Sequence, residues 1–92
     1  MDSGSFDDFA AAARAEGFDE VMERSWPADT RLDLHTHPFA LKARLLSGEM
    51  WLSIGERTQH LQAGDDFALD KEVAHAERYG PQGATYWVAR RH

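Results

Sequence analysis

The chain has 92 residues, a formal net charge of −6 and no cysteine. A chain of this length forms one domain with a thin core, which dimerisation would help to stabilise. The acidic balance and the lack of a basic stripe argue against nucleic-acid and anionic-membrane partners, and the missing cysteines exclude disulfides, thiolate zinc sites and a cysteine nucleophile.

The first residues, Met1 to Ser5, have neither the basic region nor the apolar run of a signal peptide. No segment approaches the ~20 apolar residues that cross a bilayer. We therefore expect a soluble protein of the cytoplasm.

One short amphipathic helix is predicted over residues 6–15. Ser5 and Asp8 have the spacing of a capping box, and Gly17 follows where a helix commonly ends. Phe6, Phe9, Ala10 and Ala13 recur at helical spacing, so this helix is expected to lie across an apolar surface.

Beyond Gly17 the pattern becomes that of an all-β protein. Short runs of period-two alternation are separated by turn signals such as Ser47-Gly48 and Gly80-Pro81-Gln82-Gly83. The predicted strands are 20–26, 31–36, 40–47, 49–54, 57–62, 66–69, 74–79 and 84–90. So many short strands favour a closed barrel or jelly roll, because closure removes exposed edges. We expect residues 1–92 to form a single domain whose barrel spans about 20–90.

The strand at 31–36 has two chemically different faces. Leu32 and Leu34 alternate with Asp33, His35 and His37, so the leucines are expected to lie opposite the imidazoles. If the histidines face the barrel interior, the N-terminal helix or a second subunit would have to cover the leucines. An outward-facing Trp51 would suit the interface of a homodimer.

Three histidines and a glutamate form the strongest candidate site. His35 and His37 are two residues apart and so lie on one face of a strand, and His75 and Glu77 repeat this spacing about forty residues later. Imidazole nitrogens bind divalent metals such as zinc, iron and nickel. The sequence therefore predicts a metal site with open positions. The alternatives are a solvated histidine pair, and a surface Glu77 paired with Arg78 or Arg44.

The spacing of these residues resembles the two motifs of the cupin superfamily, G-x5-H-x-H-x3-4-E-x6-G and G-x5-P-x-G-x2-H-x3-N. His35-x-His37 followed by Gly48 matches the first motif, and Gly64 followed by His75 matches the second. The resemblance covers roughly residues 20–90. It implies an all-β cupin jelly-roll barrel that binds a divalent metal ion (Zn, Fe, Ni or Mn) through His35, His37 and His75.

The chain departs from these motifs at several positions. Leu41 stands in place of the glutamate that usually completes the metal site, and Tyr79 stands at the asparagine of the second motif. Three-histidine sites are known in the superfamily, so metal binding is still expected. Glu77 is the candidate fourth ligand, or a group that orients a ligating imidazole, and Tyr79 is placed to hydrogen-bond a metal-bound ligand.

Two functions follow from the resemblance. The first is a metal-dependent enzyme, such as a dioxygenase or isomerase, that acts on a small organic molecule with Glu77 as general base and Tyr79 beside it. The second is a non-catalytic module that binds or senses a small molecule. The sequence does not decide whether the protein is an enzyme.

Overall fold

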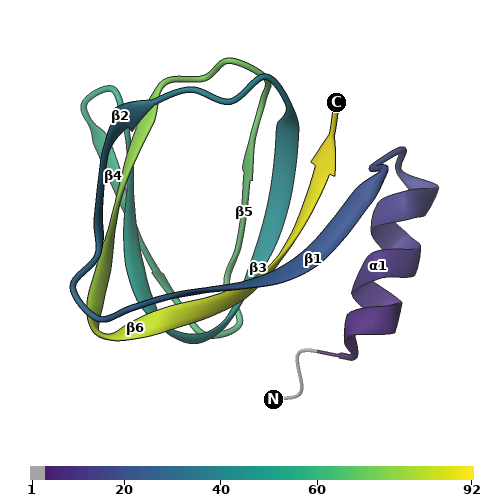
Figure 1. The fold of residues 1–92 in the computed structure, drawn as a ribbon, viewed down its shortest axis with the longest axis horizontal. Coiled ribbons are helices and arrows are strands. Elements are labelled where there is room, and N and C mark those ends of the chain that lie inside the picture. Colours follow the sequence, from purple (N-terminus) through teal and green to yellow (C-terminus); the bar gives the residue numbers. More distant parts are fainter. Residues whose placement is uncertain (1–3) are drawn as a thin grey trace.

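A computed structural model describes residues 4–92 as a strand-rich ring with one helix lying outside it (Figure 1). The elements in chain order are α1 (Phe6–Ala15), β1 (Glu20–Trp26), β2 (Arg31–His35), β3 (Ala40–Ile54), β4 (Arg57–Gln62), β5 (Asp66–Leu69) and β6 (His75–Arg91). Within residues 4–92, no helix is long and apolar enough to cross a membrane.

The predicted helix is confirmed at both ends. The Ser5 side chain accepts a hydrogen bond of 3.0 Å from the Asp8 amide, which satisfies one of the free N–H groups of the first turn. Gly17 follows the helix with a φ of 96°, a backbone conformation that favours glycine. Phe9 and Ala13 are buried against Trp87 and Ala89 of β6, so the helix covers the outer side of the barrel there.

The strands pair antiparallel in the order β1-β6-β3-β4, with β2 added to β6 and β5 added to β3. The first half of β6 pairs with β2, and its second half pairs with β1. In the same way, the first half of β3 pairs with β5 and its second half pairs with β4. β3 and β6 also pair with each other through both halves, so these two long strands belong to both walls of the barrel.

Two predicted turns are therefore wrong. Ser47-Gly48 lies inside β3, and residues 80–83 lie inside β6, so four predicted strands are two long ones. The β3–β6 register shifts on either side of Gly48, which marks β-bulges where the strand bends. Gly48 and Gly83 both have a positive φ, 77° and 71°. Glycine here bends a continuous strand rather than ending it.

The interior is filled by large apolar side chains from several strands. Leu45, Met50, Leu52, Leu61 and Tyr79 are each at most 2% exposed. The alternation of Met50, Leu52 and Ile54 along the strand predicts that all three lie in the interior. This is wrong for Ile54, which ends β3 and is 38% exposed. Burial of such side chains is the main stabilising term in a domain of this size.

The expected separation of Leu32 from the histidines is wrong. The β2–β6 register shifts between Leu32 and His35, so the alternation of faces is interrupted there. Leu32 lines the same cavity as His35, whereas Leu34 points outward and is 70% exposed. The helix covers Trp87 and Ala89 rather than Leu34.

Candidate metal centre

The three predicted histidines come together at one place in the barrel. His35 ends β2, His75 begins β6, and the two are direct partners in the β2–β6 pairing. Their ring centroids are 4.2 Å apart. The ring centroid of His37 lies 4.9 Å from that of His35 and 5.0 Å from that of His75. One ligand nitrogen from each residue lies within 4.8 Å of the others. Small side-chain rotations bring such nitrogens onto a single ion, since metal–nitrogen bonds are about 2.0–2.1 Å long.

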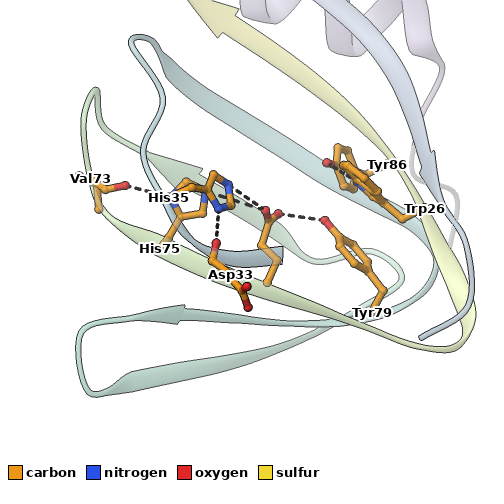
Figure 2. Close-up of polar contacts among 8 residues, drawn as sticks. Trp26, Asp33, His35, Val73, His75, Tyr79 and Tyr86 are labelled. Atoms are coloured by element: carbon orange, nitrogen blue, oxygen red, sulfur yellow. Dashed lines mark hydrogen bonds and ion pairs between the residues drawn. The ribbon is translucent and has the colours of Figure 1, made fainter. Parts of the chain in front are cut away.

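Backbone carbonyls fix the tautomer of two of these histidines (Figure 2). His35 Nδ1 lies 2.6 Å from the Asp33 carbonyl oxygen, and His75 Nδ1 lies 2.9 Å from that of Val73. A carbonyl oxygen only accepts, so each Nδ1 bears the proton and donates it. The Nε2 lone pairs are then left for a ligand. This carbonyl–imidazole arrangement is the one that commonly orients metal-binding histidines.

Burial favours the neutral form of the third imidazole. Burial lowers the pKa of His37, and the neighbouring His75 and His35 lower it further, as do Arg90 and Arg24. The His37 ring also stacks on Phe39, with centroids 4.8 Å apart. A neutral imidazole is the form that binds a metal ion.

Glu77 lies against the histidines rather than on the surface. Its Oε2 is 3.5 Å from His35 Nε2 and 3.9 Å from His75 Nε2, and its side chain is only 8% exposed. The surface alternative is not what the structure shows, because Arg44 pairs with Asp66 and Arg78 stacks on Trp51. A carboxylate oxygen and two imidazole lone pairs are all electron-pair donors, so no hydrogen bond joins them in this form, and a cation between them would bind all three. The donor set therefore fits a divalent ion.

Tyr79 contacts Glu77 from the next position on the same face of β6. Its hydroxyl donates a hydrogen bond of 2.9 Å to Glu77 Oε1, and its ring stacks on Trp26 with centroids 5.5 Å apart. Burial raises the pKa of Tyr79, and the neighbouring Tyr86 and Glu77 add to this, so the phenol stays protonated as a donor. Tyr79 is 1% exposed and is not part of the cavity wall, so it positions Glu77 instead of reaching a ligand itself.

The histidines open onto a cavity of about 130 Å³ inside the barrel. Glu77 also lines it, and so does Leu41, the residue at the place of the motif glutamate. Sequence reasoning missed two further residues of the wall, Arg24 and Arg90. The inward position of Arg24 could have been predicted from the alternation along its strand. Met22, Arg24 and Trp26 are partly buried, and the residues between them, Glu23 and Ser25, are exposed.

The remaining histidines lie outside this cluster. His60 Nε2 is 2.8 Å from Glu49 Oε2, and its ring stacks on Trp51 on the outer side of the barrel. His92 lies 3.7 Å from Glu20 Oε1. Neither imidazole belongs to the group formed by His35, His37 and His75.

Comparison with known proteins identifies the fold. No protein-family model matches the chain, and a search of curated proteins finds no relative. Among solved structures, an RmlC-like cupin from Shewanella frigidimarina superposes with a TM-score of 0.66 and 20% identity, over 77% of this chain and 65% of its own. The DMSP lyase DddQ from Ruegeria pomeroyi superposes with a TM-score of 0.70 and 23% identity, over 78% of this chain and 37% of its own.

A non-bacterial protein gives the same result. The Cnp3 cupin domain from Schizosaccharomyces pombe superposes with a TM-score of 0.71 at 11% identity, over 80% of this chain and 59% of its own. The chain thus spans less than two thirds of each of these three proteins. Identities this low establish the architecture alone. The chain has the cupin jelly-roll fold, as its motif spacing predicted.

Proposed function

We propose that this protein is a metal-binding cupin that acts on a small organic molecule in the cavity beside His35, His37 and His75. The observation that supports it is the convergence of three imidazoles, two of them with Nδ1 bonded to a backbone carbonyl and Nε2 left free. Imidazole nitrogens suit zinc, iron or nickel, and a carboxylate such as that of Glu77 suits manganese. When bound, such an ion supplies a Lewis acid with open coordination positions.

Glu77 has two roles in this proposal. Its Oε2 faces the Nε2 atoms of His35 and His75, so it is placed as a fourth ligand. Among residues 4–92 it is also the one carboxylate of the cavity wall, so, where it does not ligate the ion, it is placed to accept a proton from a bound molecule. The Tyr79 hydrogen bond holds the carboxylate in this orientation. A buried carboxylate inside the cavity favours an enzyme, such as a dioxygenase or isomerase, over a purely sensing module.

The metal content of tag-free protein tests this function directly. We expect about one divalent ion per chain by elemental analysis. Chelation by EDTA should lower Tm and re-addition of the ion should restore it, because an ion that binds only the folded state stabilises it. Protein that holds no ion after purification, and gains none from Zn²⁺, Fe²⁺, Ni²⁺ or Mn²⁺, would refute the proposal.

We further propose a homodimer through the outer side of the barrel near Trp51. Leu34 is 70% exposed and lines a surface hollow together with Trp51 and Arg78, and exposed large apolar side chains of this kind commonly mark interfaces. Light scattering should give a mass twice that of the 10.4 kDa chain. Leu34→Glu should give the monomer mass, whereas the control Glu56→Lys in the exposed β3–β4 turn should not. A monomeric wild type would contradict the dimer.

A further inference from the structure

Two arginines share the cavity with the histidines. Arg24 comes from β1 and Arg90 from the end of β6, and these strands are direct neighbours. The Arg90 guanidinium lies over the Phe39 ring at 4.7 Å, and that ring stacks on His37 with centroids 4.8 Å apart. The arginines and the three histidines therefore line one cavity.

Neither guanidinium is fully matched by protein groups. Arg24 lies over the Trp26 ring at 5.0 Å, and no ion pair within residues 4–92 involves it. Arg90 bonds Glu20 Oε1 through one terminal nitrogen at 3.3 Å. Its Nε is the only buried side-chain nitrogen or oxygen without a hydrogen-bond partner in the described part of the chain. A buried N–H donor of this kind normally has a partner, which here a ligand can provide.

The described wall of the cavity has more positive than negative side chains, with two arginines against one carboxylate, Glu77. Arg90 is partly offset by its bond to Glu20, so Arg24 has the unmatched positive charge. A bound divalent ion would add to it. Such a site concentrates anions.

The rest of the wall selects among anions. Apolar surface beside the charged groups comes from five side chains, Leu32, Leu41, Phe67, Leu69 and Val88. The volume of about 130 Å³ corresponds to roughly four water molecules, which limits the ligand to a few heavy atoms. Apolar walls suit a hydrocarbon body better than an inorganic anion.

We propose that the ligand is a short-chain organic acid whose carboxylate binds Arg24 and Arg90 while its hydrocarbon body packs on the apolar wall. This rests on the function proposed above, because the acid is the small molecule that the metal site would act on. Guanidinium groups form charge-assisted, commonly bidentate hydrogen bonds with carboxylates. Arg24 and Arg90 are thus the specificity-determining residues of the cavity.

Calorimetric titration with propanoate and with its neutral isostere propanamide tests this assignment. The metal-loaded protein should bind propanoate at least about tenfold more tightly than propanamide. Arg24→Gln should weaken propanoate binding by on the order of tenfold and leave propanamide binding unchanged. In the wild type, propanoate should also shift the Arg90 Nε–H signal in ¹⁵N NMR spectra.

Arg91→Gln is the matched control, because Arg91 also lies over an aromatic ring, Phe18 at 5.2 Å, but it is exposed and is not part of the cavity wall. It should bind propanoate as the wild type does. Equal affinity for propanoate and propanamide, an unchanged Arg24→Gln variant, or inorganic phosphate binding as tightly as propanoate would overturn the inference. The same titrations on EDTA-treated protein separate the two proposals: a chain that binds no metal can still show the arginine-dependent preference.

Discussion

The double substitution His35→Ala/His75→Ala is expected to abolish metal binding. These residues provide two of the three converging nitrogens, and both have Nε2 freed by a carbonyl bond to Nδ1. Each ligand of a protein zinc site contributes roughly 3 kcal/mol, so losing two should weaken binding by about four orders of magnitude. Zinc titration against a competing chelator measures this change.

Two control variants test whether the loss of zinc binding is specific to the histidine cluster. His60→Ala/His92→Ala removes the same number of imidazoles from outside the cluster and should bind zinc like the wild type. His75 is only 1% exposed, so alanine there also leaves a hole. The volume-conserving pair His35→Gln/His75→Gln should fold like the wild type and still bind no zinc. Equal zinc affinity in the cluster variants and the wild type would show that the ion binds elsewhere.

Glu77→Gln extends the same series. The amide can still accept the Tyr79 hydrogen bond through its oxygen, but it lacks the charge that faces His35 and His75. We expect zinc affinity to fall by about 10- to 100-fold, as is typical when a group that contacts or orients metal ligands is changed. Unchanged affinity would leave Glu77 with the role of proton acceptor alone.

Much of the site was predictable because strand geometry is regular. Residues two apart share a face of a strand, and His75 and Glu77 of β6 do so as predicted. His37 was expected on the same strand as His35, but β2 ends at His35, so His37 lies beyond the strand although its ring is still 4.9 Å from that of His35. What brings the two pairs together is the β2–β6 pairing, which joins His35 directly to His75. The sequence indicated that contact only through the resemblance to cupin motifs, because strand pairing between distant segments leaves no local signal.

The errors about strand faces and strand ends share one physical origin. Alternation predicts faces only along an unbroken ladder, and bulges interrupt it between Leu32 and His35 and around Gly48. At the first bulge Leu32 moves to the histidine side. At the second, a glycine that usually signals a turn instead lies within the continuous strand β3. Arg24 was missed for another reason, since a charged residue on an alternating strand is normally assigned to solvent.

The bend in β3 gives the largest expected effect on stability. Gly48 has a φ of 77°, and a Cβ at this position would lie 2.0 Å from the Gly83 carbonyl oxygen and 2.9 Å from the Ala84 Cα. Those atoms belong to the backbone of β6, which pairs with β3 on both sides of the contact, so they cannot move aside without breaking the ladder. Gly48→Ala should therefore lower the free energy of unfolding by at least about 3 kcal/mol, a large fraction of the stability of a small domain.

Gly55→Ala is the matched control for this prediction. Gly55 has a similar φ of 59° at the turn after β3, but a Cβ there would meet no atom within 4 Å. Gly55→Ala should therefore lower the free energy of unfolding by only the ~1–2 kcal/mol that a left-handed backbone conformation costs an alanine. Urea unfolding followed by tryptophan fluorescence measures both variants. Equal losses would mean that backbone conformation alone sets the cost, and that β3 and β6 do not pack backbone against backbone where both strands bend.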